Sequence, residues 1–237
     1  MTFSVVLSLL FWLQLVNSCT RYGDNRVYIL TRTSQRPHYF TASWKSIYKQ
    51  ILIDMVHIVS VDDDVTHSYV SQISAPLSEC TVVVDIPKNS SRVRFSHNLY
   101  LNQLLLETVK LGPGWVYILD DDNVFTERDS LSRLLSISRG DEDTLLVGRV
   151  LVGSTVIPQR LEPPFLLGDI DMGCFAFHNS WVNKTARFDD SWGADFRFFQ
   201  QLASSIGRIR WLNEIVIQTQ WKKRSWSLSG KRVDRNF

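Results

Sequence analysis

Trp115-Val116-Tyr117-Ile118-Leu119 runs directly into Asp120-Asp121-Asp122-Asn123, and this junction is the most informative feature of the chain. The apolar run predicts a buried strand, and carboxylates packed together at its end repel one another unless a cation or hydrogen-bond donors offset their charge. If the strand geometry continues, Asp120 and Asp122 point to one side and Asp121 to the other. The pair would suit a divalent cation such as Mg²⁺ or Mn²⁺; the alternative is a solvated acidic turn.

Strands and helices alternate on both sides of this junction. Apolar runs predict strands at 27–31, 56–61, 81–86, 145–152, 172–177 and 214–217, and helical spacing predicts helices around 40–51, 99–111 and 196–206. This order indicates a single α/β domain with a mostly parallel central sheet flanked by helices. Ligands of such sheets bind outside the carboxyl ends of the strands, where the two acidic clusters 62–64 and 120–122 fall.

The composition removes several classes of protein. The chain of 237 residues is 44% hydrophobic, and its 26 basic residues nearly balance 24 acidic ones, which excludes a disordered chain and binding of nucleic acid through bulk charge. Beyond the amino terminus no apolar run reaches the roughly 20 residues of a membrane span, and no period of about 20 to 50 residues repeats. Spacings typical of zinc hydrolases, serine hydrolases and P-loop proteins are missing from the sequence.

The amino terminus predicts a secretory address. Phe3–Val16 is an apolar run too short to span a bilayer, and the residues after it suit cleavage behind Ser18. We therefore expect a protein of the secretory pathway lumen (ER or Golgi) or a secreted one. The expected organisation is a signal peptide over 1–18, a globular domain over 19–220 and a basic tail over 221–237.

An uncleaved short anchor, or a lipoprotein with its lipid on Cys19, is the alternative to that cleaved signal. Sequons at Asn89 and Asn183 favour passage through a lumen. The three cysteines form neither a disulfide framework nor a metal cluster. A bridge between Cys80 and Cys174 is the pair to test, whereas a buried free thiol at Cys174 is the simpler interpretation.

The acidic junction resembles the DxD element of glycosyltransferases with the GT-A fold, most like family 2, in which the element holds the metal and the nucleotide sugar. Thr31-Arg32-Thr33-Ser34-Gln35-Arg36-Pro37 resembles the loop over the nucleotide, Asp62-Asp63 lies where an acid receives the base, and Asn98-Leu99-Tyr100-Leu101-Asn102 resembles an Asn-bearing helix. The resemblance implies that Asp122 binds the metal and that Asp120 assists it or faces the ribose. It implies nucleotide-sugar contacts for Thr31, Arg36, Asp62, Asp63, Asn98, Asp120 and Asp121.

The second half of the chain continues the resemblance. Asp169-Ile170-Asp171-Met172-Gly173-Cys174-Phe175-Ala176-Phe177 resembles the acceptor-side strand, and with the acidic junction it also partly resembles β-1,3-glucuronyltransferases, whose His-bearing carboxy-terminal segment has no match here. Asp171 would bind an acceptor hydroxyl or be an ordinary strand-end carboxylate.

Trp192-Gly193-Ala194-Asp195-Phe196 resembles the segment that opens a helix with the catalytic acid. The resemblance therefore makes Asp195 the candidate base that takes the acceptor's proton. An acid in a first helical turn is also favourable electrostatics on its own. Asp189 and Asp190 are the rival bases.

The basic tail contains Lys222 and Arg224, which would hold a diphosphate unless the tail is simply a solvated end. Taken together, the resemblance implies a hexosyl- or glucuronyl-type glycosyltransferase that uses Mn²⁺ or Mg²⁺. Its donor would be a nucleotide-diphosphate sugar, in the first place a UDP-sugar, and its acceptor a hydroxyl of a glycan or glycoconjugate, with inversion. We expect no nucleic-acid partner and no transmembrane span in the mature chain. The alternatives are a noncatalytic GT-A-like domain that binds glycan or nucleotide, and a secreted cation-binding protein.

Overall fold

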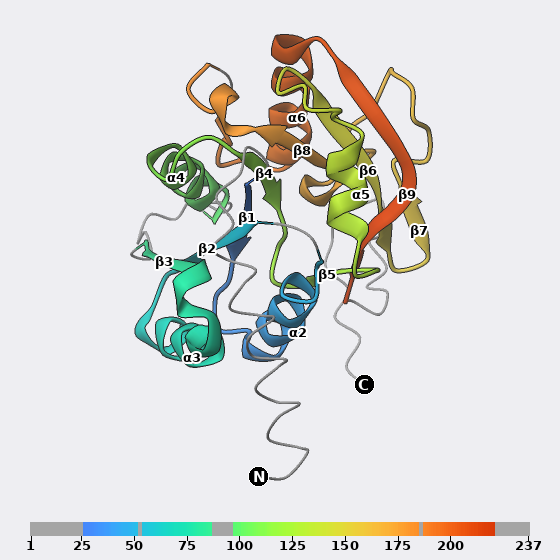
Figure 1. Cartoon of the computed structure of the whole chain (residues 1–237). Coiled ribbons are helices and arrows are strands. Elements are labelled where there is room, and N and C mark those ends of the chain that lie inside the picture. The colour runs from blue at the N-terminus through green and yellow to red at the C-terminus, as the bar shows by residue number, and fades with distance from the viewer. Residues whose placement is uncertain (1–25, 52–53, 87–96, 185–186, 221–237) are drawn as a thin grey trace, which may run out of the picture.

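The acidic junction lies in the middle of one large sheet. In a computed structural model that describes residues 26–51, 54–86, 97–184 and 187–220, nine strands of those residues pair in the order β3-β2-β1-β4-β8-β6-β9-β5, with β7 beside β6 (Figure 1). The strands are β1 (Val27–Arg32), β2 (Met55–Val61), β3 (Thr81–Asp85), β4 (Trp115–Ile118), β5 (Asn123–Phe125), β6 (Leu145–Val152), β7 (Thr155–Ile157), β8 (Phe175–His178) and β9 (Ile209–Thr219). The α-helices are α2 (Pro37–Ile47), α3 (Asp64–Ser74), α4 (His97–Lys110), α5 (Ser130–Ser136) and α6 (Ala194–Ile206). Short 3-10 turns lie at η1 (Ala75–Cys80), η2 (Met172–Cys174) and η3 (Asn179–Trp181).

One half of the sheet is parallel and sets the position of the site. β3, β2, β1 and β4 run in the same direction, so the carboxyl ends of these four strands meet at one edge. β8 then pairs antiparallel with both β4 and β6, β9 runs parallel to β6, and β5 pairs antiparallel with the end of β9. The predicted α/β fold with its mostly parallel sheet is confirmed.

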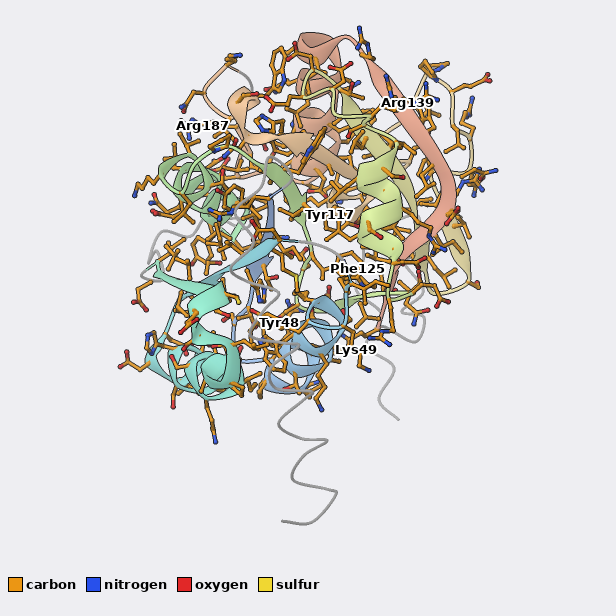
Figure 2. The ribbon with its side chains drawn as sticks, in the orientation of Figure 1. Tyr48, Lys49, Tyr117, Phe125, Arg139 and Arg187 are labelled. Carbon is orange, nitrogen blue, oxygen red and sulfur yellow. The ribbon has the colours of Figure 1, made fainter. Side chains whose placement is uncertain are left out.

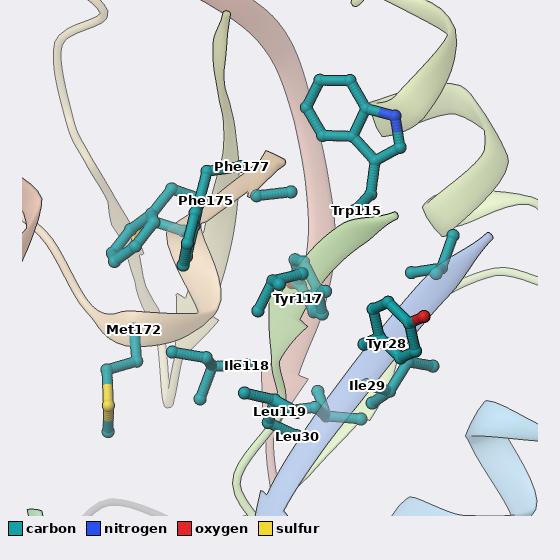
Figure 3. Close-up of a cluster of buried hydrophobic side chains, with 14 of the residues drawn as sticks. Tyr28, Ile29, Leu30, Trp115, Tyr117, Ile118, Leu119, Met172, Phe175 and Phe177 are labelled. Atoms are coloured by element: carbon teal, nitrogen blue, oxygen red, sulfur yellow. The ribbon is translucent and has the colours of Figure 1, made fainter. Parts of the chain in front are cut away.

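The core explains why β1 and β4 carry unbroken apolar runs. Helices or loops cover both faces of these strands, so every residue of Trp115–Ile118 is buried, as are the first five residues of β1. Figure 3 shows side chains of these two strands packed beside Met172, Phe175 and Phe177. In the middle of the molecule, the ring of Tyr117 stacks on that of Phe125 at 5.5 Å and its hydroxyl donates to the Gly173 carbonyl at 2.6 Å (Figure 2).

Most of the predicted elements are present, and the departures are local. The predicted strand 172–177 is wrong in its first half, because Asp171 caps a 3-10 turn over Met172–Cys174 and the strand begins only at Phe175. The strand predicted at 214–217 is part of the much longer β9. Helices α3 and α5 were not predicted from the sequence.

Several sequence features can be placed against the described residues. Cys174 is a free, buried thiol and Cys80 is disulfide-bonded, so these two cysteines are not joined to each other. Asn183 is exposed, whereas the signal peptide, Asn89 and the basic tail with Lys222 and Arg224 lie outside the described residues. No helix in the described part of the chain has the length and hydropathy that crossing a membrane requires.

Gly114, just before β4, is a point where two segments approach closely. A Cβ there would lie 2.8 Å from the Arg26 carbonyl oxygen and 2.8 Å from a ring carbon of Tyr28. Because the backbone oxygen cannot move aside cheaply, we expect Gly114→Ala to lower the free energy of unfolding by about 2 kcal/mol. Urea unfolding would measure this, with Ser136→Ala on the exposed face of α5 as control; equal stability of the two variants would contradict the packing described here.

Candidate functional site

The acidic residues form a turn rather than a continuation of β4. The strand ends at Ile118, and the Asn123 amide donates to the Asp120 carbonyl at 3.0 Å, which closes a tight turn around Asp121 and Asp122. The expectation that Asp120 and Asp122 share one side and Asp121 the other does not hold, because it assumed extended backbone. Arg36 instead contacts both Asp121 and Asp122.

Asp120 is held by an arginine of the neighbouring strand. The Arg32 guanidinium donates to the two carboxylate oxygens of Asp120 at 2.9 and 2.7 Å, and to Asn98 Oδ1 at 3.0 Å. Burial alone would raise the pKa of Asp120, but the charge and hydrogen bonds of Arg32 outweigh it and the pKa is lowered. Asp120 is therefore ionised, and Asn98 orients Arg32 from α4.

Asp121 is the buried member of the turn. Its side chain has no exposed surface, accepts from Thr33 Oγ1 at 2.7 Å and forms an ion pair with Arg36. Burial raises its pKa to about 7 even though Arg36 and Thr33 act in the opposite direction. Asp122 is less deeply placed and accepts from Arg36 Nη1 at 3.1 Å. Asp121 therefore anchors the turn, whereas Asp120 and Asp122 are both partly exposed.

Two further residues belong to this region and carried no signal in the sequence. The Gln220 amide donates to the Asp122 carbonyl at 2.7 Å, and its side chain donates to the carbonyls of Asp121 and Tyr39 at 3.1 and 3.2 Å. His97 begins α4; burial and then the charge of Arg32 lower its pKa, while Asp120 raises it. A glutamine after a strand and a lone histidine have no distinctive spacing, so only the folded chain reveals them.

Asp171 and Asp195 lie within electrostatic reach of the acidic turn. Asp171 caps η2 by accepting from the Gly173 amide at 2.9 Å, and Asp195 stands in the first turn of α6. Burial and then the charge of Asp195 raise the pKa of Asp171 to about 7, and Asp120 and Asp122 add to the effect. Burial likewise raises the pKa of Asp195, against the charge of Arg32.

The rival bases differ from Asp195 in their surroundings. Asp189 accepts from Arg197 Nε at 2.6 Å and Nη2 at 2.7 Å, and these hydrogen bonds hold its pKa far below the ordinary value. Asp190 is exposed. Asp195 forms no ion pair with any residue of the described ranges. Burial thus makes Asp195 more basic, whereas Arg197 makes Asp189 less basic.

The charge on Asp171 predicts a pH-dependent stability. The folded protein keeps the Asp171 proton up to about pH 7, whereas the unfolded chain releases it near the ordinary pKa of 3.8, so this stabilisation is full below pH 3.8 and is lost as pH rises to about 7. Asp171→Asn is neutral throughout and can still accept from Gly173. We expect its stability relative to the wild type to rise by about 2 kcal/mol between pH 4.5 and pH 8, measured by urea unfolding. A constant difference would contradict the burial of this carboxylate.

The remaining predicted residues have different placements. Thr31 is fully buried inside β1, where its hydroxyl donates to the Leu119 carbonyl at 2.8 Å and lies 2.9 Å from His57 Nε2, so contact of its side chain with a nucleotide does not fit this structure. Asp63 caps α3 by accepting from the Thr66 amide at 2.7 Å and also accepts from Gln35 Nε2 at 2.8 Å. Asp62, half-buried at the end of β2, is the member of that pair left at the sheet edge.

The acidic turn can bind a divalent cation only if a second ligand, such as a diphosphate, supplies further oxygen atoms to the ion. Among the described residues, no group of three or more His, Cys, Asp or Glu side chains lies close enough to hold a metal ion. Mg²⁺ and Mn²⁺ commonly take one or two carboxylates and complete their shells with water and phosphate oxygens. Asp122, which Arg36 contacts, and Asp120, which Arg32 holds, are carboxylates of one turn and would supply that kind of incomplete donor set. The residues present therefore fit an ion that binds together with a diphosphate.

Solved structures, but no family model and no curated protein, resemble this chain. No family model matches the chain, and no curated protein matches it. Among solved structures, Staphylococcus aureus TarS residues 1–349 superpose with a TM-score of 0.62 at 14% identity, covering 82% of this chain and 60% of TarS 1–349. The same TarS fragment in complex with UDP-GlcNAc gives 0.56 at 13% identity, covering 84% and 60%.

A second kind of enzyme has the same architecture. The mannosyltransferase PcManGT from Pyrobaculum calidifontis, in complex with GDP-Man and Mn²⁺, superposes with a TM-score of 0.55 at 14% identity, covering 92% of this chain and 66% of the enzyme. This chain thus spans about 60% of the first TarS structure and 66% of the mannosyltransferase. At these identities the likeness concerns the fold. The chain has the GT-A fold of nucleotide-sugar glycosyltransferases, and its carboxylates gather at the carboxyl-end edge of that fold's parallel strands.

Proposed function

We propose that this chain is a glycosyltransferase that moves a sugar from a UDP-sugar to a hydroxyl of a glycan or glycoconjugate, with inversion. The observation that supports this function is the gathering of Asp120, Asp122, Asp171 and Asp195 at one edge of a GT-A sheet. Solved structures with this fold include TarS bound to UDP-GlcNAc and a mannosyltransferase bound to GDP-Man and Mn²⁺. The secretory location predicted from the amino terminus is part of the proposal.

Inverting transfer needs a base on the acceptor side. The acceptor oxygen forms a bond to the anomeric carbon, the bond from that carbon to the diphosphate oxygen breaks, and the acceptor's proton passes to a base. Asp195 suits this role because burial raises its pKa and no described cation pairs with it. Asp171, held by the Gly173 amide, would accept a hydrogen bond from the acceptor hydroxyl and orient it.

The donor side would be formed by the acidic turn. Asp122, assisted by Asp120, would hold Mn²⁺ or Mg²⁺, and a bound ion supplies charge that offsets the negative charge on the leaving diphosphate. Arg36 contacts Asp122 and would meet the same phosphates. Asp62 would face the nucleobase of the donor. Lys222 and Arg224, which are predicted to contact the diphosphate, belong to the tail beyond the described residues.

Calorimetric titration of UDP into the protein, with and without Mn²⁺, tests the donor site. We expect Mn²⁺ to strengthen UDP binding about tenfold or more in the wild type, and Asp122→Asn to remove most of that gain, because Asp122 would be the main carboxylate ligand of the ion. Asp143→Asn, at an exposed loop far along the chain, is the matched control. Metal-independent UDP binding would remove the metal from the proposal. Binding without any transfer or hydrolysis of a panel of UDP-sugars would favour a noncatalytic domain.

A further inference from the structure

A wide-open cavity, lined by more apolar than polar surface, lies away from the acidic turn. It has a volume of about 520 Å³ and is lined by β6, β7, β9, α5 and the segment after β5, through Thr126, Glu127, Arg133, Arg149, Leu151, Val156, Asn213, Glu214 and Ile215. Figure 1 shows α5 lying across β6 and β9, the strands that form its wall. None of the carboxylates of the candidate site lines this cavity, so the proposed transfer reaction gives it no role.

The cavity exists because β6 and β9 lose register. From Val147 to Arg149 the chain of β6 advances two positions, while β9 advances four, from Trp211 to Ile215. Such a bulge re-aims the side chains next to it. Here it places Asn213 and Glu214 outside the regular ladder and brings Arg149 to the cavity wall.

Arg149 is the unusual residue of the cavity. Its Nε is buried and has no hydrogen-bond partner, and its guanidinium forms no ion pair with any residue in the described parts of the chain. The residue as a whole is half-buried, and leaving its shielded Nε donor without a partner is costly. Arg133 Nε likewise makes no hydrogen bond, but Arg133 differs in forming an ion pair with Glu214, at 3.0 Å.

The charges and the apolar wall indicate what would occupy the cavity. Two glutamates, Glu127 and Glu214, line it and oppose a multiply charged anion such as phosphate. A single carboxylate matches the planar fork of Arg149 in charge and geometry. Leu151, Val156 and Ile215 offer an apolar surface for the body that carries the carboxylate.

From these observations we propose that this cavity is a binding site for a small monocarboxylate, whose carboxylate the Arg149 guanidinium holds and whose body rests on Leu151 and Val156. The carboxylate can belong to a sugar acid or to an apolar organic acid. The site is independent of the proposed transfer reaction, so failure of one proposal leaves the other standing.

Thermal unfolding of the full chain against sodium glucuronate and sodium benzoate, at constant ionic strength, tests the site. We expect one of the two acids to raise the unfolding midpoint in a saturable way, which identifies the source as sugar acid or apolar acid. Arg149→Gln is expected to raise the dissociation constant of the acid that binds about tenfold or more, because a charged hydrogen-bonding partner is removed. Arg160→Gln, an exposed arginine outside the cavity, makes the same charge change and is expected to leave binding unaltered.

If Arg149→Gln does not fold, Arg149→Lys keeps the charge but loses the fork, and it is expected to weaken binding as well. The proposal is overturned if neither acid binds, if binding is equal in the wild type and the Arg149 variants, or if phosphate binds and the carboxylates do not. A saturating concentration of UDP separates the two sites. Competition by UDP would place the acid in the acidic turn and would also overturn the proposal.

Discussion

Asp195→Asn is expected to lower the rate constant of sugar transfer by about 10²–10⁴-fold while the dissociation constant for UDP stays within about twofold of the wild type. The asparagine keeps the shape of the side chain in the first turn of α6 but cannot take a proton. Asp195 interacts electrostatically with Asp171, Arg32 and Asp120, and it is not among the described contacts of Asp122 or Arg36. Loss of the base therefore separates chemistry from donor binding.

The measurement is steady-state transfer from a UDP-sugar, accompanied by calorimetry of UDP. Asp190→Asn, which changes an exposed acid five residues before Asp195, is the matched variant and is expected to keep wild-type turnover. If Asp195→Asn stays active while Asp171→Asn is inactive, Asp171 is the base and Asp195 orients the acceptor hydroxyl. If Asp195→Asn loses UDP binding as strongly as turnover, the residue belongs to the donor site instead.

Arg32→Met is expected to lower the free energy of unfolding by about 3–5 kcal/mol. The side chains of Arg32 and Asp120 are only 12% and 21% exposed, so removing the guanidinium leaves a charge with little access to water. Hydrogen bonds to both Asp120 oxygens and to Asn98 disappear at the same time.

Urea unfolding of the variant and of Arg32→Met with Asp120→Leu measures the effect. The double variant is expected to recover a large part of the loss, because no uncompensated carboxylate remains. Lys110→Met breaks the exposed pair with Glu107, where Lys110 is 65% exposed, and is expected to cost about 0.5 kcal/mol or less. Equal losses in Arg32→Met and Lys110→Met would show that the buried pair contributes no more than a surface one.

Local patterns account for the parts of the fold that the sequence predicts. A strand buried on both faces needs an unbroken apolar run, and Trp115–Ile118 is such a run. The local sequence pattern alone therefore predicts where this strand lies. A 3-10 turn and a strand both accept a short apolar run such as Met172–Cys174, so that stretch was misassigned. Only residues 214–217 of β9 were predicted as a strand, because the side chains of β9 are largely half-exposed and mixed in polarity.

The candidate site shows the same division between local and long-range information. The acidic turn is local and could be predicted, but its partners depend on register. β1 and β4 pair so that Leu30 faces Ile118, which carries Arg32 and Asp120 to equivalent places just beyond. The sequence holds no short-range sign of that alignment. For the same reason Thr31, which the resemblance placed on the nucleotide, lies in the core, while Thr33, two residues later, contacts Asp121.

The hydrogen bonds of Gln220 have a consequence for the energetics of ligand capture. They join the end of β9 to the backbone of the acidic turn and to α2. The conformation of the turn is therefore held by Gln220 as well as by the ion pairs with Arg36. A loop already fixed in one shape loses little conformational entropy when a ligand arrives. Capture at this turn is therefore expected to resemble docking onto a rigid surface, with association limited by diffusion and desolvation rather than by rearrangement of the loop.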